Sequence, residues 1–517
     1  MKVGEFLTRA AAWYPNKLAL SLVGGDRYTF KQYNDRVNSL SNALLDMGLN
    51  PQEKVAVLCH NCCEYMEVIF AAAKTRLVCT AINWRLPPDG IAFLMKDSGA
   101  KVLFFSKRFE SSLLEQLRPL ISADVRLISI EGKIEGMTDY NDLINNYPSS
   151  EPETMKSLQD DDVYQILYTS GTTGRMKGVM ITNKNTCSAV QGQLVGYSFN
   201  RRTHHLLPFP LFHIANWFPI GSVYACYTQS IMAGSFDPSQ FLEYVEKEKV
   251  TDIGVAVPMM RMLLDHPDFE KRDLSSLKTI TIGGSAIPVN LIREIKRRTN
   301  CLFFNPYGAT ECAGSMTYIN DQYYGRDASG QVSTRIESVG FPFLQCDVKV
   351  FDEEDKECLS RVIGEICVAG DNVMKGYLNM PEQTTAALKN GWYHTGDMGY
   401  LDEEGFLYIV DRKSDMIVSG GENIFPAEVE ETINSIDGVY DVAVVGLPDQ
   451  KWVESVTAFI VLKQGAVLTE EMVIDYCKNR IAGYKKPRKV YFVKEIPKNA
   501  AGKTLRRDLR EQYSKKS

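Results

Sequence analysis

The sequence has no long apolar run and no excess of basic residues, and each absence excludes a class of protein. No stretch of about 18 apolar residues occurs, so no membrane-spanning helix is predicted. The formal net charge is -6, which argues against nucleic-acid binding, because proteins that bind nucleic acid carry basic surfaces. Glu5 and Arg9 interrupt the N-terminal stretch, which therefore does not resemble a signal peptide. The sequence predicts a cytoplasmic protein and leaves peripheral membrane contact open.

The sequence also lacks a cysteine pattern of the kind that builds disulfides or zinc sites. Its 12 cysteines are scattered, mostly within apolar segments, which fits reduced cytoplasmic thiols. Cys59, Cys62 and Cys63 lie close together in the sequence, around His60. No second cysteine or histidine pair follows at ligand spacing, and a tetrahedral zinc site needs four ligands. We therefore predict neither a disulfide framework nor a zinc centre.

No internal repeat or low-complexity segment occurs, and 517 residues are too many for one compact core. Short apolar runs alternate with helical patterns up to about residue 105, and the alternation resumes after residue 183. This alternation is typical of doubly wound parallel sheets. We predict two α/β subdomains, at about residues 1–164 and 165–335.

The pattern changes near residue 338 to short alternating strands with glycine turns, which predict a β-rich subdomain over residues 336–413. A hairpin there is expected to bring Asp397 close to Arg412. Helices and strands then continue over about 100 residues, which could fold alone. The expected fold class is α/β: a large N-terminal domain of two doubly wound α/β subdomains plus a small β-barrel, followed by a small mobile α+β C-terminal domain.

Residues 168–178, Tyr-Thr-Ser-Gly-Thr-Thr-Gly-Arg-Met-Lys-Gly, carry the clearest chemical signal. The glycines let the backbone approach a ligand closely, the hydroxyl groups can donate hydrogen bonds, and Lys177 adds a positive charge. The spacing is not that of a Walker loop, because the residue five after Gly171 is Met176, and a strand is expected to follow. The segment predicts a polyphosphate-binding loop between two strands; a flexible surface turn is the alternative.

Four further motifs follow in a fixed order: residues 307–311 (Tyr-Gly-Ala-Thr-Glu), 393–397 (Tyr-His-Thr-Gly-Asp), 411–424 and 497–503 (Pro-Lys-Asn-Ala-Ala-Gly-Lys). Together with the loop they resemble the adenylate-forming superfamily of acyl-CoA synthetases, peptide-synthetase adenylation domains and beetle luciferases. The resemblance covers nearly the whole chain. It implies ATP, Mg²⁺ and CoA as cofactors, a small carboxylic acid as substrate, and a monomer or homodimer.

The resemblance implies a role for each residue of a nucleotide site. Glu311 carries a carboxylate suited to Mg²⁺, with Thr172 as a second metal contact. Tyr307 can stack on adenine, and Asp397 with Arg412 can bind the ribose hydroxyls. The implied nucleotide contacts are Thr169, Ser170, Gly171, Thr172, Thr173, Gly174, Lys177, Gly284, Ser285, Ala286, Asn305, Tyr307, Gly308, Thr310, Glu311, Asp397, Arg412, Gly420, Gly421 and Lys503.

The resemblance also implies movement of the C-terminal domain, residues 415–517, about a hinge at Ser414. Gly420 and Gly421 would lie in the loop that turns toward the active site, and Lys503 would contact the α-phosphate and the carboxylate. Lys503 with Glu311, Thr169, Lys177 and His213 forms the expected catalytic set. Thr504 is expected to cap the final helix.

Residues 208–217 resemble the family segment that lines the acyl pocket, with His213 at its mouth. A lone histidine in an apolar run is more often a core residue, which is the alternative interpretation of His213. The expected acyl contacts are His213, Phe212, Trp217, Gly284, Gly308, Cys312 and Ala313. They suggest an apolar cavity, for which medium-chain, aromatic and alicyclic acids all stay open.

The predicted function is therefore that of an AMP-forming carboxylic acid–CoA ligase. Three alternatives stay open at this point: loading of a carrier protein instead of CoA, a luciferase-like oxidation of the adenylate, and a non-catalytic nucleotide-binding scaffold. The presence of Glu311, Asp397, Arg412 and Lys503 argues against the scaffold.

Overall fold

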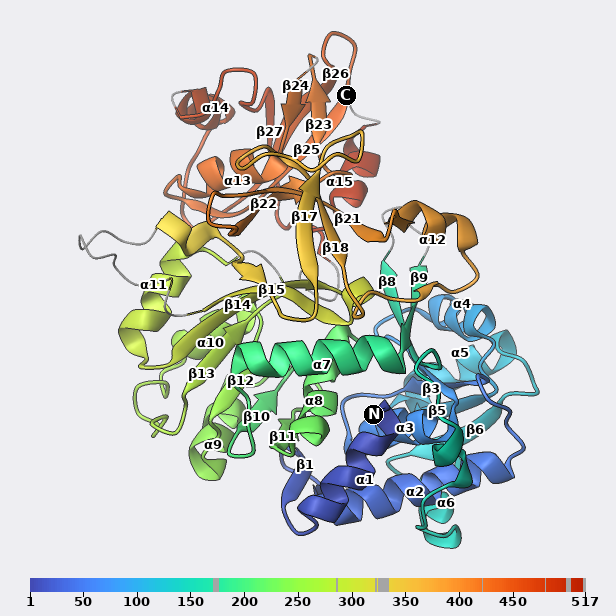
Figure 1. The fold of residues 1–517 in the computed structure, drawn as a ribbon. Coiled ribbons are helices and arrows are strands. Elements are labelled where there is room, and N and C mark those ends of the chain that lie inside the picture. Colours follow the sequence, from blue (N-terminus) through green and yellow to red (C-terminus); the bar gives the residue numbers. More distant parts are fainter. Residues whose placement is uncertain are drawn as a thin grey trace. The chain divides into compact units, whose positions relative to one another are not determined.

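A computed structural model describes residues 1–170, 176–284, 287–320, 323, 334–420, 422–478, 480–498 and 504–514. The chain divides into two compact units (Figure 1). The first contains Met1–Val348 and Val368–Tyr393, and the second contains Lys349–Cys367 and His394–Ser517. The predicted α/β class is confirmed. Among the described residues, no helix is long and apolar enough to cross a membrane.

The first unit contains an eight-stranded sheet in the order β19-β9-β8-β4-β3-β5-β6-β7. Its strands from β3 to β8 pair in parallel, whereas β9 pairs antiparallel with β8 and β19 antiparallel with β9. The strands are β3 (Lys54–Leu58), β4 (Val78–Ala81), β5 (Val102–Ser106), β6 (Arg126–Ile130), β7 (Thr138–Asp139), β8 (Val163–Ser170), β9 (Met176–Thr182) and β19 (Gly376–Tyr377). The helices of this part of the chain are α1 (Val3–Trp13), α2 (Phe30–Asp46), α3 (Cys63–Thr75), α4 (Pro88–Ser98), α5 (Glu115–Leu117) and α6 (Tyr140–Asn146).

A nine-stranded sheet in the order β16-β15-β14-β13-β12-β10-β11-β1-β2 completes the first unit. Its strands are β1 (Leu18–Leu22), β2 (Arg27–Thr29), β10 (His204–Leu207), β11 (Thr228–Ile231), β12 (Asp252–Val255), β13 (Thr279–Ile282), β14 (Leu302–Ala309), β15 (Gly314–Asn320) and β16 (Phe341–Pro342). The helices between them are α7 (Asn183–Tyr197), α8 (Trp217–Ala225), α9 (Pro238–Glu248), α10 (Val257–Leu264) and α11 (Val289–Arg298).

Neither sheet is built from one continuous part of the chain. β1, near the N-terminus, pairs in parallel with β11 of the nine-stranded sheet, and β8 and β9 join the sheet built from the strands before them. The expected subdomain boundary near residue 164 therefore falls within β8. Local hydrophobic patterns could not reveal this exchange, because strand pairing depends on segments far apart in the sequence.

The β-rich region forms a five-stranded sheet in the order β17-β18-β21-β20, with β22 also paired to β21. These strands are β17 (Asp347–Phe351), β18 (Gly364–Ala369), β20 (Leu388–Lys389), β21 (Trp392–Leu401) and β22 (Leu407–Arg412), and α12 (Pro381–Ala387) precedes β20.

The C-terminal part has its own five-stranded sheet, in the order β24-β23-β26-β25 with β27 paired to β26. Its elements are β23 (Ile417–Ser419), β24 (Glu422–Ile424), α13 (Pro426–Asn434), β25 (Val439–Asp449), β26 (Val453–Leu462), α14 (Glu470–Lys478), β27 (Lys489–Phe492) and α15 (Arg506–Tyr513). Val429 and Ile433 of α13 pack with Val444 and Val456 of the sheet in one buried cluster. The expected cap at Thr504 was wrong, because Leu505 occupies the cap position of α15 and no side chain caps the helix.

A buried polar network joins the C-terminal end of α3 to the segments around it. The side chain of Lys74 is fully buried, and its Nζ donates to four oxygens at 2.7–2.9 Å, those of Thr8, Asn34, Asn38 and Glu151. Burial is the largest influence on Lys74 and lowers its pKa to about 8. An ammonium has three N–H groups, so these acceptors can satisfy all of its donors in place of the water lost on burial.

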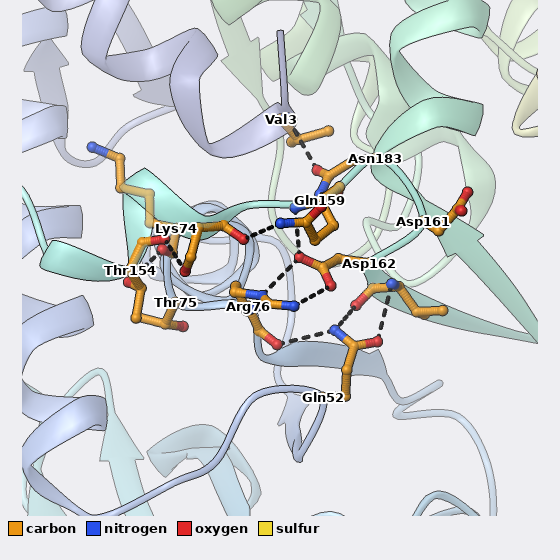
Figure 2. Close-up of polar contacts among 12 residues, drawn as sticks. Val3, Gln52, Lys74, Thr75, Arg76, Thr154, Gln159, Asp161, Asp162 and Asn183 are labelled. Carbon is orange, nitrogen blue, oxygen red and sulfur yellow. Dashed lines mark hydrogen bonds and ion pairs between the residues drawn. The ribbon is translucent and has the colours of Figure 1, made fainter.

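The same end of α3 is tied to the start of β8. Arg76 adopts the left-handed conformation that ends the helix, and its guanidinium binds both carboxylate oxygens of Asp162 at 2.9 and 3.0 Å. Gln52 accepts a hydrogen bond from the amide of Val163 and donates to the carbonyls of Arg76 and Val163 (Figure 2). These contacts fix the base of the strand that leads to the predicted phosphate loop.

We expect Lys74→Met to lower the thermal unfolding midpoint by roughly 5 °C or more, because removing one partner leaves Glu151 and the two asparagines without their buried donor. The matched control is Lys156→Met, since the pair of Lys156 with Glu153 is largely exposed and should contribute less than about 1 kcal/mol. Differential scanning calorimetry checks both variants. Equal midpoints for the two would show that the buried network does not stabilise the fold.

Candidate active site

The loop predicted to bind polyphosphate lies at the end of an antiparallel strand pair. Thr169 of β8 pairs with Lys177 of β9, and Ser170 pairs with Met176, so the two ends of the loop are held side by side. The expectation of a strand after the loop is thus confirmed. Gly171, Thr172, Thr173 and Gly174 lie outside the described residues.

Tyr377 connects the two charged groups expected near the phosphates. Its hydroxyl donates to Oε1 of Glu311 at 2.9 Å, and Nζ of Lys177 lies 4.8 Å from the centroid of its ring. Burial, followed by the charge of Glu311, raises the pKa of Tyr377 well above its ordinary value, so the hydroxyl stays a donor. Tyr377 reaches this place because β19 pairs with β9, with Tyr377 opposite Val179.

Sequence reasoning missed Tyr377. No motif contains it, and almost 200 residues separate it from the loop. A tyrosine directly after a glycine was the only local signal, and this is too common to be informative.

Glu311 is held where β14 ends and a short turn of 3₁₀ helix, Thr310–Cys312, begins. Its carbonyl accepts from the amide of Met374 at 2.7 Å, and the carbonyl of Cys312 accepts from Asn372 at 3.1 Å. Within the described ranges, neither Glu311 nor Lys177 forms an ion pair with a protein side chain. A carboxylate without a cationic partner can bind Mg²⁺, which in nucleotide sites is held by one or two carboxylates together with phosphate oxygens of the substrate.

The other expected adenine-side residues lie along β14 and beside it. Asn305, Tyr307 and Gly308 are in β14, and Thr310 follows it. A Cβ at Gly308 would come within 2.2 Å of the carbonyl oxygen of Gly314, so only glycine fits the narrow hairpin with β15. Gly284 has a positive φ of 91° just after β13, which runs parallel to β14. Ser285 and Ala286 lie outside the described residues.

In the second unit the predicted hairpin is confirmed, because Asp397 of β21 lies opposite Arg412 of β22. Nε of Arg412 is 2.9 Å from Oδ1 of Asp397. Thr395 fixes the preceding turn: its hydroxyl donates to the carbonyl of Ile366 at 2.7 Å and accepts from the amide of Asp397 at 3.0 Å. Gly396 supplies the positive φ of 73° that the turn requires.

Ser414 lies in the exposed turn directly after β22, where the amides of Asp415 and Met416 both donate to the carbonyl of Arg412. Gly420 has a φ of 64°, and a Cβ there would come within 2.8 Å of Trp452, so the turn requires glycine. Gly421 and Lys503 lie outside the described residues.

The residues of the expected acyl segment lie in two places. The rings of Phe212 and His213 are 4.4 Å apart, and the guanidinium of Arg85 is 5.7 Å from the ring of Phe212. Trp217 instead stacks on Tyr197 with ring centroids 5.9 Å apart. A cavity of about 40 Å³ lies near the first group and is lined by His60, Asn61, Trp84, Arg85, Pro208, Pro210, Gly234, Phe236 and Met259.

His213 is held neutral. Burial, followed by the charge of Arg85, lowers its pKa to about 4, and its Nε2 is buried without a hydrogen-bond partner among the described residues.

Cys312 and Ala313 are buried between Glu311 and β15. Among the residues that the structure describes, no cluster of histidine, cysteine or acidic side chains could hold a metal ion by itself.

Comparison with known proteins agrees with this geometry. The family model described as AMP-binding enzyme matches residues 7–378, and the model of the AMP-binding enzyme C-terminal domain matches residues 428–503. The chain is 34% identical over 493 residues to the long-chain-fatty-acid–CoA ligase FadD13 of Mycobacterium tuberculosis, covering 94% of this chain and 93% of that protein. It is 32% identical over 518 residues to the feruloyl-CoA synthase of an Amycolatopsis species, covering 99% of each.

Among solved structures, o-succinylbenzoate CoA synthetase (MenE) from Bacillus subtilis, in complex with its acyl-adenylate intermediate, is similar, with a TM-score of 0.85 and 29% identity. The similarity covers 98% of this chain and 97% of that one. The chain therefore belongs to the AMP-binding enzyme family. Within this family, these similar proteins are named as CoA ligases, synthases or synthetases.

We expect Tyr377→Phe to weaken the binding of Mg-ATP by about 10-fold, because a hydrogen bond to a charged group contributes about 1.5 kcal/mol or more. The ring beside Lys177 is retained, so the fold should not change. Isothermal titration calorimetry measures the affinity. Tyr147→Phe is the control, because its hydroxyl also donates to a carboxylate, that of Asp46, at an exposed position; equal affinities for both variants would rule out a role for Tyr377 in positioning Glu311.

Proposed function

We propose that the protein activates a carboxylic acid with Mg-ATP to an acyl-adenylate and then transfers the acyl group to CoA as a thioester. The observation that carries the proposal is the cluster of Lys177, Tyr377 and Glu311 beside the loop between β8 and β9. The cluster contains one cation and one carboxylate, neither paired with a protein charge within the described ranges, beside the end of the strand pair that flanks the glycine-rich segment. This is the combination that binding of a triphosphate with a divalent cation needs.

In the first step, a carboxylate oxygen of the acid forms a bond to the α-phosphorus of ATP. The bond from that phosphorus to the oxygen bridging to the β-phosphate breaks, and pyrophosphate leaves. Lys177 and the loop stabilise the charge on the departing phosphates, and Lys503 the charge at the α-phosphate. Glu311, with Thr172, would hold Mg²⁺, which neutralises phosphate charge. Asp397 and Arg412 would fix the ribose.

In the second step, the thiolate sulfur of CoA forms a bond to the carbonyl carbon of the adenylate, the bond from that carbon to the phosphate oxygen breaks, and AMP leaves. We assign the change between the steps to rotation of residues 415–517 about Ser414, which lies in an exposed turn after β22. Neutral His213 lies near the cavity at Trp84 and Arg85, and an uncharged imidazole there can orient a substrate without binding it as an ion pair. Phe212, Gly284, Gly308, Cys312, Ala313 and Trp217 are the proposed acyl contacts.

The substrate is proposed to be a medium-chain, aromatic or alicyclic acid. The names of the similar proteins include a fatty acid and the aromatic acid ferulate, which supports an acid with a sizeable apolar part. AMP release across a panel of such acids, with CoA or a phosphopantetheinyl carrier protein as acceptor, tests the proposal. Release with CoA as the preferred acceptor is expected, whereas no AMP with any acid would favour a non-catalytic scaffold.

Glu311→Gln should lower kcat/KM for AMP formation by about 100-fold or more, because the neutral amide cannot hold the divalent cation that stabilises charge in the transition state. The matched control, Glu382→Gln, changes an exposed acid in the first turn of α12. A loss of activity no larger than that of the control would remove Glu311 from the proposed site.

Lys503→Ala should abolish exchange of labelled pyrophosphate into ATP but spare thioester formation from supplied acyl-adenylate, since Lys503 is assigned to the first step only. Lys498→Ala is the control, because Lys498 belongs to the same segment and pairs with Asp441 at 2.6 Å. Equal loss of both half-reactions in the Lys503 variant would contradict the assignment of Lys503 to one conformation.

A further inference from the structure

Gln193, in the last two turns of α7, is a buried polar side chain that the protein does not satisfy. It is fully buried, and among the described residues neither its Nε2 nor its Oε1 has a hydrogen-bond partner. Leaving a primary amide unpaired in the protein interior costs about 1–3 kcal/mol for each group. Most buried polar side chains are paired, so an amide with both of its polar atoms unpaired is unusual and can bind a ligand.

The amide lies beside the proposed acyl contacts. A Cβ placed on Gly314 would be 2.9 Å from Nε2 of Gln193, 3.1 Å from its Oε1 and 3.1 Å from Cδ1 of Trp217. The amide of Gln193 and the edge of the Trp217 indole therefore both lie next to the position that a Cβ on Gly314 would occupy. Gly314 begins β15, three residues after Glu311. Gln193 thus lies in the same region as Trp217 and Ala313, two of the proposed acyl contacts.

A second unsatisfied acceptor comes from the loop after β16. Oε1 of Gln345 is buried without a partner among the described residues, while its Nε2 donates to the carbonyl of Ser315 at 3.0 Å. Gln345 packs on α7 at Gly192, where a Cβ would come within 1.8 Å of that Oε1. The nearby Tyr197 and Ser315 hydroxyls, in contrast, are paired with each other at 3.1 Å.

Aromatic side chains cluster around Tyr197, which stacks on Trp217. Tyr197 contacts Trp217, Phe304 and Phe343 with centroid distances of 5.9, 5.6 and 5.4 Å. An apolar wall with a few unsatisfied polar groups is the usual construction of a small-molecule site, in which the polar groups select the ligand.

We propose that Gln193 determines specificity by binding a neutral hydroxyl group on the acyl part of the acid. This inference rests on the proposed function and names the class of its substrate. A hydroxyl group can donate to Oε1 and accept from Nε2, so it satisfies both atoms of the amide. A plain hydrocarbon satisfies neither. A second carboxylate cannot donate to the two unpaired amide oxygens, of Gln193 and Gln345, so a hydroxylated acid fits better than a diacid.

The experiment compares matched acids that differ in one hydroxyl group, 3-phenylpropanoate with 3-(4-hydroxyphenyl)propanoate and octanoate with 8-hydroxyoctanoate. The measured quantity is kcat/KM for AMP formation by the full-length protein. We expect at least about a 10-fold preference for the hydroxylated member in one series, because a site built to bind a hydroxyl discriminates against the analogue that lacks it. Gln193→Leu should abolish that preference while activity with the unsubstituted acid is kept or raised.

Gln191→Leu is the matched control, because Gln191 is exposed on the same helix and donates to Tyr224 at 3.1 Å. It should leave the ratio of the two kcat/KM values unchanged. A purely structural role for Gln193 would lower activity with both acids equally and leave the ratio as in the unaltered protein, which overturns the proposal. Equal kcat/KM for both members in both series also overturns it while the proposed function stands, whereas no AMP with any acid overturns both.

Discussion

The antiparallel pairing of β8 with β9 is the constraint on which the proposed site depends. It holds Thr169 opposite Lys177, so the two ends of the glycine-rich segment lie side by side. The same pairing leaves the other edge of β9 open to β19, which brings Tyr377 to the loop. At the base of the pair, Gln52 and the ion pair of Arg76 with Asp162 fix the start of β8. One strand pair therefore connects the parallel sheet to the residues expected to contact phosphate.

Tyr377 also explains how opposite charges can lie near each other without pairing. Its hydroxyl binds Glu311 and its ring lies beneath Lys177, so both charged groups have a partner that does not neutralise them. A direct ion pair between lysine and carboxylate would have to be broken before phosphate and a cation could bind, at a cost in affinity. Placing an aromatic hydroxyl between them keeps the site ready for its ligand.

Lys74 and Gln193 show two ways in which the fold treats a fully buried polar side chain. Lys74 donates to acceptors from four different residues and acts as a structural tie between α3 and its neighbours. Gln193 is equally buried, but within the described ranges both atoms of its amide lack a partner. Because most buried polar groups in proteins are paired, the contrast supports the proposed ligand-binding role of Gln193.

The sequence by itself determined the features that depend on neighbouring residues: the loop between two strands, the hairpin that pairs Asp397 with Arg412, and the α/β class. It also carried the ordered motifs from which ATP chemistry was inferred. Only the tertiary structure decided that β1 joins the nine-stranded sheet, that Tyr377 reaches Glu311, and that Gln193 is buried beside Gly314 without a partner. The physical reason is that turn and strand preferences act over a few residues, whereas sheet pairing and burial depend on contacts between segments far apart in the sequence, such as Tyr377 and Glu311, 66 residues apart.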